Sequence, residues 1–386
     1  MRREARLQSR IDSFFGMMDY WMLVPILLIT LMGLVILNHV LSSGYGVATF
    51  EYPMNFYKQI GAVFVGVTVA LLICLFDSPT LRLFGMIVFG ASLLLLLYIK
   101  VDGYSLRAVT GADSWMQLPV IGSYQPSELA KLGIIMVSAY AFAGMRDGKV
   151  SYLNGSVTVA LSFFVPLGLI LLEPDFGTAM VIIFMFVAMV FVFGLKWRDI
   201  LVGLSAVVVA VPLLWLYVLS PYQQNRILTF IFPGHDKTAS YHIGQSLAAI
   251  ASGGLTGAPD ETRVLVPVKE SDFIYTALSE NMGLIGTTAL IILIVFFVVR
   301  AVHVAIQVYR YGNRAESYIM VGALAFFSAH FIENLGMCVG LMPITGIPLP
   351  FFSLGGSSMV TSYITLGVML NVSMNHKMLV TGSEPG

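Results

Sequence analysis

Long apolar runs recur along the whole chain, and they constrain its fold more than any other feature. About ten of them hold roughly 17–25 mostly apolar residues, the length that an α-helix needs to cross a bilayer. They cover residues 21–41, 59–76, 83–99, 128–145, 156–172, 178–194, 200–219, 275–300, 317–341 and 357–374. Because the lipid core tolerates only helices and closed barrels, these runs predict an all-α polytopic membrane protein with about ten transmembrane helices.

The composition agrees with this fold class. Hydrophobic residues make up 58% of the chain, charged residues only 11%, and the mean hydropathy is +0.86. A soluble domain carries roughly 25% charged residues, so this chain has too few to cover a water-exposed surface. The formal net charge is zero, which gives no reason to expect a nucleic-acid partner. We expect one membrane domain over residues 1–386, with Cys74 and Cys338 as buried core residues.

The distribution of Lys and Arg predicts the orientation. They are concentrated in alternate short connections and near the N-terminus: Arg2, Arg3, Arg6, Arg10, Arg82, Arg146, Lys149, Lys196, Arg198, Arg300, Arg310, Arg314 and Lys377. The positive-inside rule therefore places both termini in the cytoplasm. The first apolar run is long enough to span, so we interpret it as an uncleaved helix rather than a signal peptide. The chain is predicted to lie in a cell membrane as a multi-pass protein, with its active face extracytoplasmic.

A long extracytoplasmic loop, residues 220–274, is predicted between helices 7 and 8. Its segments 221–232 and 241–252 are amphipathic, and Gly253 and Gly254 follow the second. Both segments are predicted to form interfacial helices. A plain connector does not need such helices, so function is expected on the outer face; the alternative is a folded cap.

Glu128 and Lys131 are ionisable residues at the start of the fourth span. Their i, i+3 spacing places them on one helix face, and ionisable residues at membrane depth are candidates for function. Ser127 is expected to cap this helix, with Pro126 just before it. The alternative is an ion pair that only anchors the helix.

Two aspartates lie near the outer ends of spans. Asp175 follows Pro174 in a turn and is expected to cap the sixth span. Asp272 precedes the eighth span, with Glu280 two turns further in. A carboxylate at an apolar boundary has a raised pKa, which suits a general base acting on a sugar hydroxyl. A helix-capping role for Asp272 is the competing interpretation.

Two features precede the last span. His330 and Glu333 share one face of the ninth span and are expected to form a buried hydrogen-bonded pair. Residues 343–350 contain three prolines and cannot form a regular helix. A non-helical segment at this depth is tolerated where it lines a cavity or is buried in protein.

Six motifs in a fixed order resemble those of the SEDS family of bacterial cell-wall proteins. They are residues 125–131 (QPSELAK), 174–178 (PDFGT), 241–246 (YHIGQS), 252–255 (SGGL), 272–274 (DFI) and 348–358 (PLPFFSLGGSS). The resemblance covers residues 22–377, and the short N-terminus with residues 333–337 favours the RodA-like branch over FtsW. Ser114 and Leu247 depart from the pattern, since Arg and Lys are usual there.

The resemblance implies a peptidoglycan glycosyltransferase that polymerises lipid II beside a class B penicillin-binding protein. It makes Asp272 the essential acidic residue. Supporting or substrate-binding positions are Glu128, Lys131, Asp175, Gln245, Ser246 and Glu280. Candidates for neutralising the leaving pyrophosphate are Lys131, Arg226 and Lys269, with a divalent cation (Mg²⁺ or Mn²⁺) as a further candidate. The alternative function is a lipid II flippase, whose key charges would lie nearer the membrane midplane.

Overall fold

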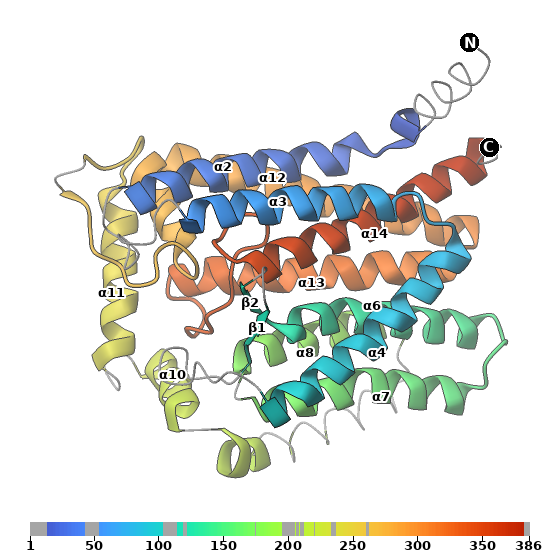
Figure 1. Ribbon diagram of the computed structural model, residues 1–386. Coiled ribbons are helices and arrows are strands. Elements are labelled where there is room, and N and C mark those ends of the chain that lie inside the picture. The colour runs from blue at the N-terminus through green and yellow to red at the C-terminus, as the bar shows by residue number, and fades with distance from the viewer. Residues whose placement is uncertain are drawn as a thin grey trace.

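The computed structural model describes most of the chain and shows an almost wholly helical protein (Figure 1). It describes residues 14–42, 54–102, 114–118, 122–173, 175–194, 205, 208, 212–219, 221–232, 237–259 and 262–381. Within these ranges the only strands form one short antiparallel hairpin. The expectation of an all-α polytopic membrane protein is therefore confirmed.

The elements follow one another in a simple order. They are α2 (Tyr20–Ser42), α3 (Met54–Ile73), α4 (Ser78–Asp102), β1 (Met116–Leu118), β2 (Gly122–Tyr124), α6 (Pro126–Arg146), α7 (Tyr152–Leu171), α8 (Phe176–Phe193), a π-helical turn (Leu214–Val218), α10 (Pro221–Ile231), α11 (Lys237–Ser252), α12 (Ile274–Tyr311), α13 (Arg314–Cys338) and α14 (Gly356–Thr381). The amphipathic helices expected in the long loop correspond to α10 and α11, although α11 begins four residues before the expected start.

Eight of these helices are long and apolar enough to cross a membrane, counting only the described residues: α2, α3, α4, α6, α7, α8, α12 and α13. The expected seventh span, 200–219, lies largely outside the described residues. The expected tenth span is present as α14, whose 26 residues are long enough to cross, but α14 is more polar than the other eight helices.

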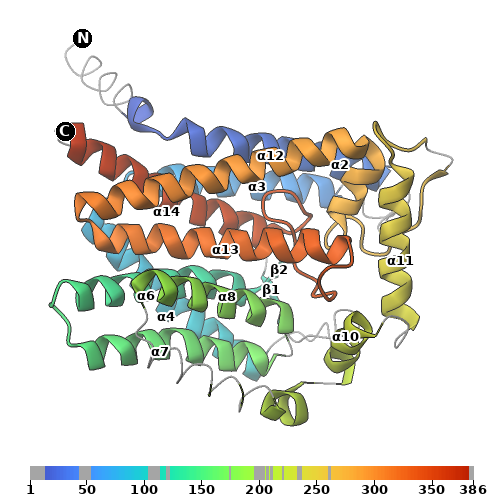
Figure 2. The ribbon, with the colours of Figure 1, turned by 180° about the vertical axis from the view of Figure 1, so that it is seen from behind.

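The polarity of α14 follows from its position inside the bundle. It packs along α3, α6 and α13 (Figures 1 and 2), and its side chains are buried along most of its length. The amide of Asn371 donates to the carbonyl oxygens of Ile73 at 2.9 Å and Phe76 at 2.6 Å. Because its side chains are buried against protein along most of its length, α14 does not need the apolar surface of a lipid-facing helix.

The two ends of the described chain meet at one end of the bundle. Lys377 near the end of α14 donates to the carbonyl oxygens of Met17 at 3.0 Å and Met18 at 3.1 Å, just before α2. Helices α10 and α11 lie across the opposite end, which is named the outer end after its expected orientation (Figures 1 and 2). The long loop and the described ends of the chain are therefore on opposite sides of the bundle.

Helix α12 is interrupted near its outer end, which the apolar run did not predict. Gly283 has φ 60° and ψ −156°, far from helical values. The turn after α11 fills the break: Leu284 N–H donates to Gly254 O at 2.9 Å, and Ile285 N–H donates to Leu255 O at 3.2 Å. A Cβ at position 283 would lie 2.4 Å from the Leu255 carbonyl carbon. The outer segment of α12 is thus fastened to the long loop.

Candidate active site

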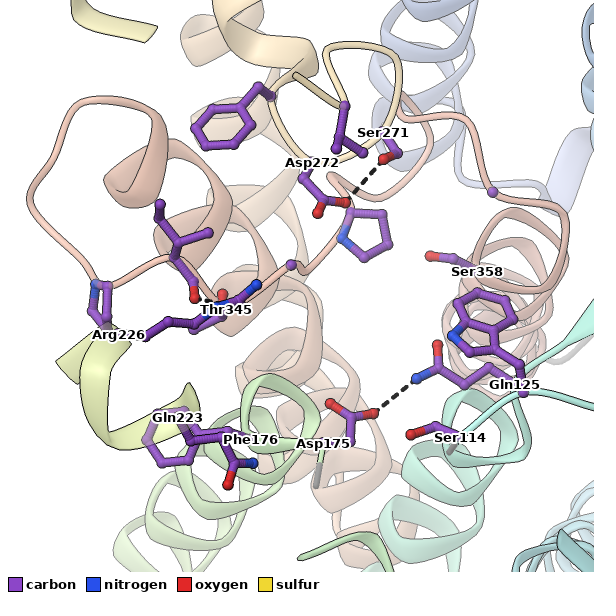
Figure 3. A pocket seen from close by; sticks show the side chains of 18 of the residues that line it. Ser114, Gln125, Asp175, Phe176, Gln223, Arg226, Ser271, Asp272, Thr345 and Ser358 are labelled. Atoms are coloured by element: carbon purple, nitrogen blue, oxygen red, sulfur yellow. Dashed lines mark hydrogen bonds between the residues drawn. The ribbon is translucent and has the colours of Figure 1, made fainter. Parts of the chain in front are cut away.

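A cavity of about 440 Å³ lies at the outer end of the bundle, where several segments far apart in sequence meet (Figure 3). Its lining comes from the segment before β1, the starts of α6, α8 and α14, helices α10 and α11, the turn before α12, and the proline-rich loop. The polar or charged members are Ser114, Gln125, Asp175, Gln223, Arg226, His242, Ser271, Asp272, Thr345, Ser357 and Ser358. Three of the predicted site residues are among them, namely Asp175, Arg226 and Asp272.

Asp272 belongs to a tight turn that precedes α12. The N–H groups of Ser271 and Phe273 both donate to Val268 O at 3.3 Å, and Val268 has a positive φ of 54°. The N-cap of α12 is Phe273, without a capping side-chain bond. The interpretation of Asp272 as a helix cap is therefore wrong, and its carboxylate faces the cavity.

The surroundings of Asp272 increase its affinity for a proton. Burial raises the pKa of the Asp272 carboxyl above its ordinary value near 3.8, and the nearby Glu270 raises it further. The hydrogen bond from Ser271 Oγ to Asp272 Oδ1, 3.0 Å long, and the charge of Arg226 lower it in part. Since desolvation is the largest effect, the carboxylate is a better proton acceptor than an exposed aspartate.

Arg226 on α10 supplies positive charge to the cavity. Among the described residues that line it, Arg226 is the one Arg or Lys. Its Nη1 donates to Ile344 O at 2.9 Å, which fastens α10 to the proline-rich loop. Ser114 also lines the cavity and donates to Glu173 O at 3.3 Å. The positive charge facing a substrate is therefore concentrated on α10.

Asp175 lies across the cavity from Asp272 (Figure 3). Its Oδ1 accepts from Thr178 N–H at 3.0 Å, so the expected capping of α8 is confirmed. Its Oδ2 accepts from Gln125 Nε2 at 2.8 Å. The same carboxylate thus caps the start of α8 and orients the Gln125 amide on the cavity wall. Pro174 lies outside the described residues.

Glu128 and Lys131 lie inside the bundle and do not line the cavity. Their charged atoms are 2.8 Å apart, and both side chains are almost fully buried. The expected pairing on one helix face is confirmed. The expected cap is wrong: α6 begins at Pro126, its N-cap is Gln125, and the Ser127 hydroxyl is buried without a partner among the described residues.

His330 does not pair with Glu333, contrary to expectation. Its Nε2 accepts from the Lys131 ammonium at 2.9 Å, and its Nδ1 donates to Pro348 O at 3.3 Å. The hydrogen bond with Lys131 of α6 therefore replaces the expected one with Glu333, which lies on the same helix as His330. Through His330, the buried Glu128–Lys131 pair contacts the proline-rich loop that forms part of the cavity wall.

The remaining predicted residues surround the turn without lining the cavity. Ser246 on α11 is fully buried, with its hydroxyl 2.6 Å from Thr276 Oγ1 and 2.8 Å from Cys338 O. Gln245 is half-buried beside it. A direct substrate contact by either residue stays a prediction.

Lys269 and Glu280 form a second buried ion pair, with 2% and 0% of their side chains exposed. Glu280 Oε1 also accepts from Val264 N–H at 2.7 Å, and Lys269 donates to Val264 O at 3.2 Å. Burial lowers the pKa of Lys269. The ammonium is thus engaged in holding residues 264–269 against α12, rather than facing the cavity.

The comparisons with known proteins agree with this geometry. The model of the FtsW/RodA/SpoVE family, described as "Cell cycle protein", matches residues 20–378. The chain belongs to this family.

Named relatives in the family include proteins called MrdB and proteins called FtsW. The chain is 28% identical over 368 residues to "Peptidoglycan glycosyltransferase MrdB" of Escherichia coli, covering 92% of this chain and 94% of that one. It is 30% identical over 375 residues to "Probable peptidoglycan glycosyltransferase FtsW" of Legionella pneumophila, covering 95% and 93%. The expected activity class, peptidoglycan glycosyltransferase, is confirmed by these names.

Solved structures of the family share the fold. The rod shape determining protein RodA of Thermus thermophilus is 27% identical, with a TM-score of 0.66, covering 94% of this chain and 97% of that one. A chain from a structure titled "Structural coordination of polymerization and crosslinking by a peptidoglycan synthase complex" is 29% identical. Its TM-score is 0.77, and the match covers 93% of this chain and 98% of that one.

The cavity offers a limited set of metal ligands for a family member expected to use a divalent cation. Within the described ranges, no group of three or more His, Cys, Asp and Glu side chains is close enough to hold an ion. Asp175 and Asp272 both line the cavity, but from opposite sides (Figure 3). Mg²⁺ is commonly held by one or two carboxylates together with substrate phosphates, so one of these carboxylates, Asp175, fits an ion that is shared with a bound phosphate group.

Sequence reasoning missed several polar residues of the site. Gln223 lies on the amphipathic segment that was recognised, and its position on the polar face of that helix was the available signal. Gln125, His242 and Ser358 belong to quoted motifs, but no role was given to them. Their convergence depends on tertiary packing, which no local pattern contains.

Proposed function

We propose that this chain polymerises lipid II into glycan strands, with Asp272 as the general base on the acceptor sugar hydroxyl. The observation that carries the proposal is the position of Asp272. Its carboxylate has no helix-capping role, faces the cavity at the outer end of the bundle, and shares that cavity with Arg226. A base needs direct access to the proton it removes, and this position provides it.

The reaction transfers one sugar chain to another. The 4-hydroxyl oxygen of lipid II bonds to the anomeric carbon of the growing strand, and Asp272 takes the hydroxyl proton. The bond from that carbon to the lipid-linked pyrophosphate breaks, and its electron pair leaves with the pyrophosphate. Attack from the face opposite the leaving group turns the donor's α-linkage into a β-linkage.

Arg226 is the side chain that best suits the leaving pyrophosphate. Charge that develops in a transition state is stabilised by fixed cationic groups in the site, and Arg226 lines the cavity while Lys131 and Lys269 are each paired with a buried glutamate. A bound Mg²⁺ or Mn²⁺ would neutralise further phosphate charge. Asp175 is the carboxylate that would hold it, because Asp272 must stay free to accept the proton.

The flippase alternative is less well supported by the positions of the charged groups. A carrier places its key charges near the midplane, at the site where the substrate binds. The buried Glu128, Lys131 and His330 are linked by hydrogen bonds through Lys131 and do not line the cavity. The buried acids Asp19, Glu316 and Glu333 do not line it either. The carboxylates that do line it, Asp175 and Asp272, come from the outer ends of the helices.

The partner is proposed to be a class B penicillin-binding protein that crosslinks the new strands, and the role that of the RodA-like branch in cell elongation. The likeness to a chain from a complex that coordinates polymerization and crosslinking supports the first part. The cytoplasmic placement of both termini is likewise proposed, from the positive-inside rule.

Removing the carboxylate tests the base. Purified Asp272→Ala and Asp272→Asn variants are expected to polymerise labelled lipid II about 10²–10⁴-fold more slowly than the wild type, the usual contribution of a general base. In the wild type the rate should rise as the pH increases through the pKa of Asp272, because only the ionised carboxylate accepts a proton. That rise should begin above the range of an ordinary aspartate.

Asp147→Asn is the matched control, since Asp147 pairs with Arg314 and Lys149 at the opposite end of the bundle. It should keep the wild-type rate. Equal polymer from the wild type and both Asp272 variants would refute the base assignment.

A further inference from the structure

The side chain of Asn334 connects the turn that carries Asp272 to the proline-rich loop. Asn334 lies on α13 and is fully buried. Its Nδ2 is 2.9 Å from Asp272 O and 2.7 Å from Ile347 O. The two carbonyls are 75 residues apart in sequence, so a single amide group joins two segments of the cavity wall that have no local connection.

The chemistry of these contacts determines the orientation of the amide. Carbonyl oxygens only accept hydrogen bonds, so the atom between them must be the nitrogen, which donates both of its protons. Asn334 Oδ1 is buried and has no hydrogen-bond partner among the described residues. An unpaired buried acceptor destabilises the fold. The orientation that lets the Asn334 amide donate to both carbonyls therefore lowers stability by leaving Oδ1 unpaired.

Three successive carbonyls of the turn are bonded in this way. Glu270 O accepts from Leu354 N–H at 3.0 Å, Ser271 O from Ser353 Oγ at 2.6 Å, and Asp272 O from Asn334. The third bond acts on the peptide group of Asp272 itself. Cys338 Sγ also approaches this oxygen, at 3.8 Å, as a weak donor.

We infer that Asn334 is a positioning residue for Asp272, acting through the backbone carbonyl to hold the carboxylate toward the cavity. The inference rests on the proposed role of Asp272 as the base. If a catalytic carboxylate shifts by about 1 Å from the proton it removes, the reaction rate can fall by about 10²-fold. The amide does not touch the substrate; it limits the motion of the residue that does.

Titratable groups from several elements surround the Asp272 carboxylate or share its cavity. They are Glu270 in its own turn, Arg226 on α10, His242 on α11, Asp175 at the start of α8 and Cys338 on α13. Asn334 carries no charge, so replacing it leaves this set unchanged. A change in the pH profile would then report a change in the position of the carboxylate.

The chain provides a matched control in Asn371 on α14. Asn371 is also fully buried and also donates both amide protons to two carbonyls, those of Ile73 and Phe76. These carbonyls belong to the end of α3 and the residues just after it, at the opposite end of the bundle from the cavity. Leucine at either position removes two donors from a buried site, and at position 371 it also removes the acceptor of Asn375 Nδ2.

The experiment compares Asn334→Leu with Asn371→Leu in the full-length protein, reconstituted in nanodiscs and supplied with labelled lipid II. Both variants should unfold at a lower temperature than the wild type. Only Asn334→Leu should lower kcat, by about 10–100-fold per folded molecule, with little change in KM. Its acid limb should move to lower pH, because a loosened carboxylate is better hydrated and its pKa falls toward the ordinary value.

A milder variant covers the case in which Asn334→Leu does not fold. Asn334→Ser can donate to one of the two carbonyls, and an intermediate kcat with a smaller shift of the acid limb is expected. Equal kcat and an unchanged acid limb in Asn334→Ser and Asn371→Leu would overturn the inference. If Asp272→Ala polymerises normally in the same assay, the proposed base is wrong; if only the Asn334 variants are normal, the base stands and the positioning role fails.

Discussion

The carboxylate of Asp272 lies close to the backbone of the proline-rich loop. A Cβ built on Gly346 would be 3.4 Å from Asp272 Oδ2, and Gly346 has a positive φ of 74°. The space beside the carboxylate therefore depends on a residue that has no side chain. An acceptor hydroxyl approaching Asp272 would use this space.

A methyl group at position 346 is expected to obstruct the base. Gly346→Ala should lower the rate of lipid II polymerisation at least tenfold, measured per folded molecule. Gly148→Ala is the control, because Gly148 has a similar φ of 70° in an open turn with no atom within 4 Å of its Cβ position. Both variants should lose about 1–2 kcal/mol of stability from left-handed strain. Loss of activity in both would show that strain, rather than access, is responsible.

Motifs identified the central residue of the site, and packing decided the rest. The Asp272 motif lies in the cavity wall, as a functional acid must. The cap expected from Ser127 failed because Pro126 occupies the first helical position and leaves Gln125 as the N-cap. The pairing expected for His330 failed because the imidazole instead accepts a hydrogen bond from Lys131, which is distant in sequence. Spacing along one helix gives no information about the side chains of the next helix.

At the scale of elements, the long loop is bonded to α12 at two separate sites. The turn after α11 bonds to the backbone on both sides of Gly283, and the Lys269–Glu280 pair fixes residues 264–269 against the outer segment. Asp272 lies between these attachments. The outer segment of α12 and the loop should therefore unfold as one unit.

The Lys269–Glu280 pair is expected to act in stability rather than in substrate binding. Lys269→Met leaves a buried carboxylate without its cation and should destabilise the protein by about 3–5 kcal/mol. Adding Glu280→Gln should restore most of this loss, because glutamine can still accept from Val264 N–H. Thermal unfolding measures the stability and lipid II titration measures KM. A double variant with normal stability but a greatly raised KM would instead support direct pyrophosphate binding by Lys269.

Apolar runs predicted most of the helices because each spanning helix must satisfy its backbone internally and present apolar side chains to lipid. The runs could not show the break at Gly283, since the atoms that compensate it come from Gly254 and Leu255. They also gave no warning that α14 is screened from lipid by its neighbours. Both features depend on contacts between elements.

At the scale of the whole molecule, the bundle has two unlike ends. One end carries the cavity, α10 and α11, and the other carries the exposed Arg314–Asp147 pair and the junction of Lys377 with Met17 (Figure 2). The positive-inside rule assigns the second end to the cytoplasm. Lipid II would then be used on the outer surface of the membrane.

Cysteine labelling in intact cells tests this orientation. The two native cysteines, Cys74 and Cys338, are buried, so an introduced cysteine should dominate the reaction with a membrane-impermeant maleimide. Thr256→Cys, exposed in the turn after α11, should label in intact cells. Lys149→Cys, exposed between α6 and α7, should label only after permeabilisation. The reverse pattern would invert the proposed topology.

The bonds that fix the turn of Asp272 have a consequence for biosynthesis. Its three carbonyls accept from Asn334, Ser353 and Leu354, which lie 62 to 84 residues further along the chain. A ribosome adds about 5–20 residues per second, so these donors are added several seconds after Asp272 itself. A chain whose synthesis stops at the end of α13 therefore lacks Ser353 and Leu354, and the turn of Asp272 gains all its bonds only after the proline-rich loop has been made.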